Sequence, residues 1–117
     1  MKAITALCAA ALLTVGMAGG VLAAQTSVTG HLRDSFCYVG MGAHGASHQK
    51  CAIGCAKAGI PVVLVDDKTD NYYVLLPPKN AQPLPSSIIN KMEDEVTVTG
   101  QEYNKGGVRF LTVESVK

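Results

Sequence analysis

Residues 61–76, PVVLVDDKTDNYYVLL, predict the fold class of this chain. The segment begins with a short apolar run at 62–65, which is typical of a strand buried on both faces. Residues 67–71 then supply the Asp, Thr and Asn side chains of a turn, and residues 72–76 return as a second strand. The stretch therefore predicts a β-hairpin and favours a mainly β fold.

Three further segments alternate apolar and polar residues with the period of two of half-buried strands: 25–34, 95–103 and 108–116. In the first segment, Gly30 stands between Val28 and Leu32 on the apolar face, which predicts a bulge or a tight bend. Five strands in one small chain favour a closed antiparallel barrel, because closure leaves no exposed strand edge.

Two short helices are expected beside the strands. The first spans residues 48–58, with Ser47 as its N-cap and Gly59 directly after its last turn. The second begins at a pair of serines and covers residues 86–92. The glycine-containing segment 34–47 shows no periodicity, so it is expected to form a loop.

Two parts of the chain resemble the strands of small exported OB-fold-like β-barrel proteins. These are VTGHL at residues 28–32 and the last hairpin, with VTVTG at 96–100 and VRFL at 108–111. The resemblance covers about half of the chain that follows the signal-like segment. It implies a five-stranded OB-like barrel but no function, because OB domains bind many kinds of ligand.

The first residues have the layout of a secretory signal peptide. Lys2 precedes an uncharged run at 3–24, and residues 21–23, Val-Leu-Ala, place small side chains where signal peptidases cut. We therefore expect a signal peptide at 1–23 and a single domain at 24–117. The mature protein is expected to be periplasmic or secreted. An uncleaved membrane anchor is the alternative, because the uncharged run is long enough to span a bilayer.

The balance of charges limits the classes of partner that the mature chain is expected to bind. The chain has ten Lys and Arg residues, of which Lys2 belongs to the signal, and nine Asp and Glu residues. The net charge of the mature chain is therefore near zero. The absence of a basic stripe argues against nucleic acid or an anionic membrane as a partner. No Ser–His–Asp set and no carboxylate pair emerges from the spacing, so the sequence favours binding over catalysis.

Residues 37–55, CYVGMGAHGASHQKCAIGC, hold three of the four cysteines and two of the three histidines. The remaining cysteine lies in the signal, so the exported chain has an odd number of them. On the predicted helix, His48, Cys51 and Cys55 stand at i, i+3 and i+7, so all three lie on one face. The Cβ atoms of each successive pair are about 5–6 Å apart. We expect these three residues to be the core ligands of a metal site.

Cys37, at the end of the first strand, and His44, in the glycine-rich loop, are expected as additional ligands, which places the site in a loop-helix insertion at 37–58. Thiolate and imidazole bind zinc, and soft thiolate also selects Cu(I), which we slightly favour. The pair Cys51-x3-Cys55 with a nearby histidine is similar, in its ligands alone, to the copper site of Sco-type cytochrome oxidase assembly proteins. The expected function is an exported metal-binding or metal-delivery protein, whose partners are a metal ion and another periplasmic protein.

Two alternatives stay open for the same segment. A disulfide from Cys37 to Cys51 or Cys55 would close a loop of roughly 15–19 residues, worth about 3 kcal/mol, and would give a stapled binding module without a metal. Alternatively, the protein is a thiol-redox partner in which Cys51 is the attacking thiolate. Asp34, next to the segment, is expected to form an Asx-type turn or to hydrogen-bond a ligating histidine.

Overall fold

The computed structural model describes residues 24–117, so the expected signal peptide at 1–23 lies outside the described residues. The elements in chain order are β1 (Ala24–Asp34), α1 (Ser35–Met41), the 3-10 turn η1 (Ala46–His48), α2 (Gln49–Lys57), β2 (Val62–Asp66), β3 (Tyr72–Leu76), α3 (Ser86–Ile89), β4 (Glu95–Lys105), β5 (Val108–Thr112) and β6 (Ser115–Val116). Among the helices of the described part, none has the length and apolarity needed to cross a membrane.

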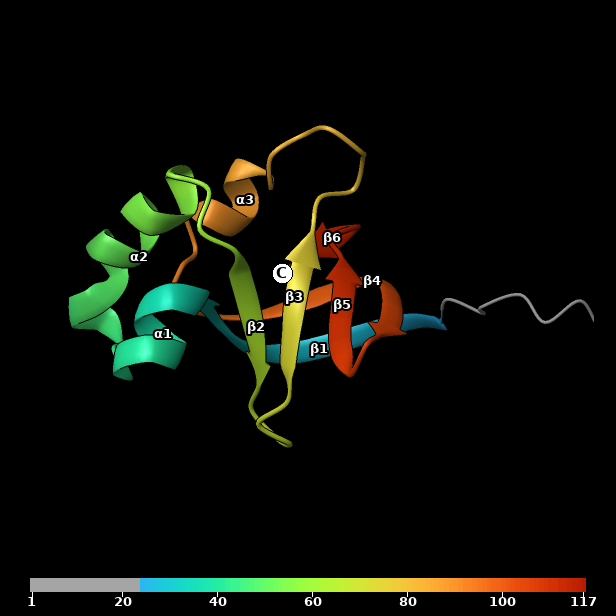
Figure 1. Cartoon of the computed structure of the whole chain (residues 1–117). Helices are drawn as coiled ribbons and strands as arrows, with labels where there is room; N and C mark the ends of the chain where they lie inside the picture. The colour runs from blue at the N-terminus through green and yellow to red at the C-terminus, as the bar shows by residue number, and fades with distance from the viewer. Residues whose placement is uncertain (1–23) are drawn as a thin grey trace, which may run out of the picture.

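Five strands close into a small barrel, which confirms the predicted OB-like fold (Figure 1). The order around the barrel is β1-β2-β3-β5-β4, and β4 pairs with β1 to complete the circle. The sheet is mostly antiparallel, as expected, but β3 and β5 run parallel, so the barrel is mixed. The expected last strand is divided, because β5 ends at Thr112 and the short β6 pairs with the same edge of β4 nearer to its start.

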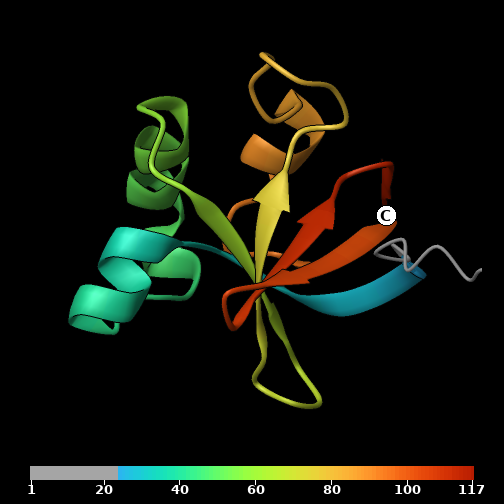
Figure 2. The same ribbon diagram turned by 45° about the vertical axis from the view of Figure 1, so that its right-hand side comes forward.

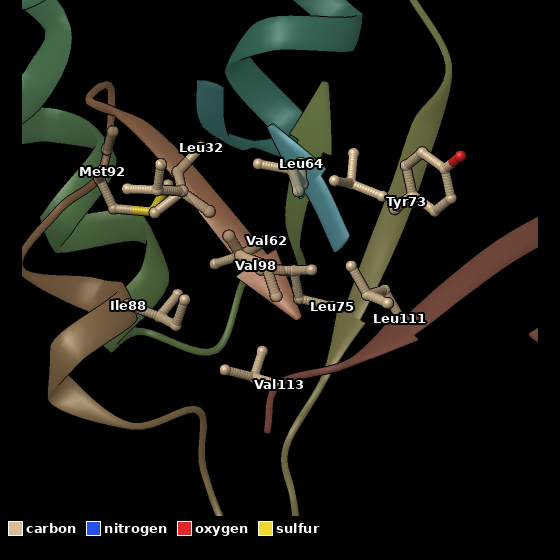
Figure 3. Close-up of a cluster of buried hydrophobic side chains, with 13 residues drawn as sticks. Leu32, Val62, Leu64, Tyr73, Leu75, Ile88, Met92, Val98, Leu111 and Val113 are labelled. Atoms are coloured by element: carbon tan, nitrogen blue, oxygen red, sulfur yellow. The ribbon is translucent and has the colours of Figure 1, made fainter. Parts of the chain in front are cut away.

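The barrel encloses an apolar core (Figure 3). Leu32 of β1, Leu64 of β2, Val98 of β4 and Leu111 of β5 are all fully buried there. Each such side chain contributes about 1.5–3 kcal/mol through the apolar area that it removes from water. The alternation read from the sequence therefore matches the burial: in β1 the inward residues are buried, whereas the outward ones are exposed or half-buried.

Gly30 lies where β1 passes from one pairing partner to the other. The strand pairs with β4 from Ala24 to His31 and with β2 from Gly30 to Asp34. A Cβ atom at Gly30 would lie 2.0 Å from the carbonyl oxygen of Val65, so only glycine allows this close approach. Glycine at this position thus lets β2 lie directly against β1.

Between β1 and β2, the chain forms a helical lobe on one side of the barrel, where α1 lies beside α2 (Figures 1 and 2). We name residues 35–61 the helical insertion. The expectation of a loop at 34–47 was wrong for its first half. The α1 helix forms because the Asp34 side chain caps it, and it ends where Gly42 adopts a left-handed conformation with φ of 68°.

The predicted helix at 48–58 is present as α2, Gln49–Lys57. Ser47 is not its N-cap, because the preceding residues form the turn η1 and His48 occupies the cap position without a side-chain cap bond. At the other end, Gly59 follows the helix with a positive φ of 92°, as the sequence predicts.

Candidate metal centre

The cysteines of the helical insertion converge at the junction of α1 and α2. Cys37 lies in the first turn of α1, and Cys51 and Cys55 follow each other on α2. Their three sulfur atoms lie within 4.8 Å of one another. Sulfur atoms from two separate helices therefore meet at one point, which is the arrangement that a shared ligand requires.

A second group of ligand atoms adjoins the first through Cys37. Asp34, Cys37 and His48 each contribute one atom to a set that also lies within 4.8 Å. Nε2 of His48 is 2.9 Å from Oδ2 of Asp34. Cys37 belongs to both groups and thus connects the thiols with the carboxylate–imidazole pair.

Asp34 is fully buried and makes several polar contacts. It accepts a hydrogen bond of 2.8 Å from the Cys37 backbone N–H, in addition to its bond with His48. Burial alone would raise the pKa of Asp34, but these hydrogen bonds outweigh burial, so its pKa lies below the usual 3.8. Asp34 is therefore a carboxylate at neutral pH.

The ionised carboxylate also fixes the histidine tautomer. A carboxylate only accepts hydrogen bonds, so Nε2 of His48 must carry the proton that it donates to Asp34. In the neutral imidazole, Nδ1 is then the nitrogen whose lone pair can bind a metal ion. A histidine oriented by a carboxylate in this way is a frequent arrangement behind metal-ligating imidazoles.

The thiols differ in their surroundings. Burial raises the pKa of Cys37 to about 12, and the neighbouring Asp34 carboxylate and Cys55 thiol act in the same direction. Burial and the charge of Asp34 likewise raise the pKa of Cys55. A bound cation reverses this preference, because it replaces the thiol protons and compensates the charge of the carboxylate.

The thiols also differ in their access to solvent. Cys37 is buried, Cys55 is half-buried and Cys51 is exposed. The group is therefore closed on the side of the barrel and open on the outer side of α2. An ion or another thiol can approach it through Cys51.

Of the five residues expected as ligands, His44 is placed apart from the others. It is exposed, its Nδ1 lies 2.8 Å from the carbonyl oxygen of Gly42, and its ring stands edge-on to Tyr38. It belongs to neither group of ligand atoms. The remaining four, Cys37, His48, Cys51 and Cys55, lie at the same corner of the molecule.

The barrel holds the start of α2 through two side chains. The buried Glu93 accepts a hydrogen bond of 2.7 Å from the Gly45 backbone N–H and pairs with Arg33 of β1. Nε2 of Gln49 donates to the Met92 carbonyl oxygen at 3.0 Å. These bonds fix η1 and α2 against the segment that precedes β4, so His48 and the α2 cysteines have a defined position.

A third group lies on the outside of the barrel, away from the cysteines. His31 is cross-strand partner of Glu95, and its Nδ1 lies 2.7 Å from Asp67. No sequence pattern groups these residues, because their closeness depends on the pairing of β1 with both β2 and β4. All three are exposed or half-buried, which is typical of solvated polar groups on a protein surface.

Comparisons of the chain with models of protein families, with curated proteins and with solved structures give no match. A function must therefore be inferred from the chemistry of the site.

Proposed function

We propose that this protein binds one thiophilic metal ion through Cys37, Cys51 and Cys55, and that it is an exported metal-binding or metal-delivery protein. The observation that supports this most is the convergence of three sulfur atoms within 4.8 Å from two helices. Helix register alone brings Cys51 and Cys55 together, whereas Cys37 reaches them only because Asp34 starts α1 at the right place.

The donor set favours Cu(I) over zinc. Three sulfur donors suffice for Cu(I), which is selected by soft thiolate ligands. Zinc in structural sites takes four ligands, and here the fourth would be His48, which is grouped with Cys37 and Asp34 rather than with Cys51 and Cys55. In either case the Asp34 carboxylate orients the imidazole and contributes negative charge.

Delivery of the ion to another protein is supported by the unequal exposure of the thiols. Cys51 is exposed, so an acceptor thiol can displace it first while Cys37 and Cys55 retain the ion. Such stepwise exchange needs one accessible ligand and a protected remainder. The signal-like N-terminus supports the proposal that this exchange occurs outside the cytoplasm.

The test is an anaerobic titration of the reduced protein with Cu(I) and, separately, with zinc, each against a competing chelator. We expect one ion per chain. Serine at Cys37, Cys51 or Cys55 is expected to weaken binding at least 100-fold, and His48→Ala by about 10–100-fold, as for residues around other metal sites.

Two histidine variants serve as controls. His44→Ala matches His48→Ala in chemistry but lies outside both groups around the cysteines, and His31→Ala removes the imidazole of the separate surface group. Both should leave the affinity unchanged. Cysteine variants that bind as tightly as the parent, or an equal loss from His44→Ala and His48→Ala, would contradict the proposal.

A further inference from the structure

The three thiols form a graded series from solvent to interior. Cys51 is exposed, Cys55 is half-buried and Cys37 is buried. The three sulfur atoms lie within 4.8 Å of one another, so the sulfur of Cys55 is close to those of both Cys51 and Cys37. Cys55 has the intermediate exposure of the three. A disulfide between Cys51 and Cys55 can therefore be exchanged within the site for one between Cys37 and Cys55.

We propose that these thiols act as a thiol–disulfide relay, in which Cys51 reacts with an external disulfide and the oxidation ends as a Cys37–Cys55 bridge. The relay itself needs no metal. Its consequence for the metal rests on the proposed function: the bridge removes two of the three sulfur ligands, so oxidation releases the ion.

The relay proceeds in three exchanges. Cys51, as thiolate, attacks one sulfur of the external disulfide, forms a mixed disulfide and releases the first external thiol. Cys55 then attacks the sulfur of Cys51, which releases the second external thiol and forms a Cys51–Cys55 bridge. Finally, Cys37 attacks the sulfur of Cys55, and Cys51 leaves as a thiol. In total, one external disulfide is reduced to two thiols, while Cys37 and Cys55 lose two protons and two electrons to it.

The geometry of the two bridges favours the last exchange. A Cys51–Cys55 bridge joins successive turns of one helix and constrains little, whereas a Cys37–Cys55 bridge ties α1 to α2 and closes a loop in the chain. The final bridge also involves the buried cysteine, so external thiols reach it less easily than the intermediate. Because Cys37 is buried, its attack is expected to be the slow exchange.

The experiment uses the metal-free, reduced full chain with Cys8→Ser in every variant, so that only the three thiols remain. Glutathione disulfide is added anaerobically, free thiols are blocked at intervals, and the modified peptides are mapped by mass spectrometry. We expect glutathione first on Cys51 and, at the end, a Cys37–Cys55 bridge with Cys51 free.

Single variants test each exchange. Cys51→Ser should slow oxidation at least 10-fold and still yield the Cys37–Cys55 bridge. Cys55→Ser should accumulate glutathione on Cys51, and Cys37→Ser should stop at the Cys51–Cys55 bridge. The relay would be overturned by first modification at Cys37 or Cys55, by oxidation of Cys51→Ser at the parental rate, or by a parental end product bridged between Cys51 and Cys55.

A parallel sample is loaded with one equivalent of Cu(I) before oxidation, and the released ion is measured with a chelator. Release in step with formation of the bridge is the expected result. Failure to load the ion while the bridge still forms would count against the proposed metal function and leave the relay standing. Loading followed by a different pairing would count against the relay alone.

Discussion

The barrel and the helical insertion are built on different interactions. The barrel buries aliphatic side chains from every strand, with Leu32, Leu64 and Leu111 among those fully removed from solvent. In the insertion, by contrast, α1 buries only Cys37 and α2 only Ala52. The apolar side chains of α1 point outward instead, with exposures of 64–66% for Phe36, Val39 and Met41.

This difference shows how the two parts depend on each other. Hydrophobic burial between the strands stabilises the barrel. The insertion adds only Ala52 to that core, with Ile53 and Ala56 packed against it. Its position therefore also relies on the bonds of Asp34, Glu93 and Gln49. In our account, the ion bound by the thiols supplies the remaining stabilisation. Substitutions in the two parts should therefore have different consequences.

The largest effect is expected in the barrel, from Gly30→Ala. The added Cβ would lie 2.0 Å from a backbone oxygen of β2, and the backbone of a closed barrel has little room to move. We expect a loss of at least about 3 kcal/mol, the upper end of the usual cost of overpacking. Urea unfolding followed by circular dichroism measures this loss.

Gly54→Ala is the matched control in the insertion. A Cβ atom at Gly54 meets nothing within 4 Å, and the residue lies inside α2. Alanine should stabilise the helix by up to about 1 kcal/mol, because glycine is a poor helix former. Equal destabilisation by both substitutions would contradict the contrast between the tightly packed barrel and the open insertion.

A smaller effect is expected at the border of the two parts, from Asp34→Ala. The change removes the N-cap of α1 and leaves the His48 bond unmade, at about 1 kcal/mol each and about 2 kcal/mol in total. Asp34→Asn keeps a capping oxygen and should cost less. The result is measured by urea unfolding at neutral pH, and losses below a few tenths of a kcal/mol would show that Asp34 does not hold the insertion.

Asp34 also gives the stability a dependence on acid. Its folded-state pKa lies below the unfolded value of 3.8, so its contribution is present above that pH and is lost as the pH falls through the folded pKa. The free energy of unfolding of the parent protein should therefore fall over this acid range. In Asp34→Asn, the part of that fall that is due to Asp34 should be missing.

Alkaline pH should also lower the stability of the metal-free, reduced protein. The pKa of Cys37 is raised from 9.0 to about 12, so its contribution is complete below pH 9 and is lost as the pH rises toward 12. Cys37→Ala should flatten this loss, whereas Cys51→Ser, at the exposed end of the group, should retain it. If the free energy of unfolding of Cys37→Ala fell with pH as steeply as that of the parent, the loss could not be attributed to Cys37.

The barrel was largely predictable because its signals are local. The run Val62–Val65 and the alternation around Val98 each specify a strand and the face that it buries, and both are observed. The parallel pairing of β3 with β5 was not predictable, because it depends on how distant strands meet after the barrel closes.

The candidate site was predictable only in part. Helix periodicity places Cys51 and Cys55 together, and the structure agrees. The role of Asp34 was underestimated, although an Asp three residues before Cys37 is a recognisable N-cap pattern. His44 was expected as an additional ligand because its glycine loop could fold toward the helix, but it belongs to neither group of ligand atoms, and its Nδ1 lies 2.8 Å from the Gly42 carbonyl oxygen.

X-ray absorption spectroscopy of the anaerobically loaded protein tests the central claim most directly, because it counts the sulfur atoms around the ion. We predict three sulfur neighbours for Cu(I), or three sulfurs at about 2.3 Å with one nitrogen for zinc, and one sulfur fewer in Cys51→Ser. A first shell of oxygen and nitrogen alone, or one that keeps its sulfur count in the variant, would contradict a metal site built by Cys37, Cys51 and Cys55.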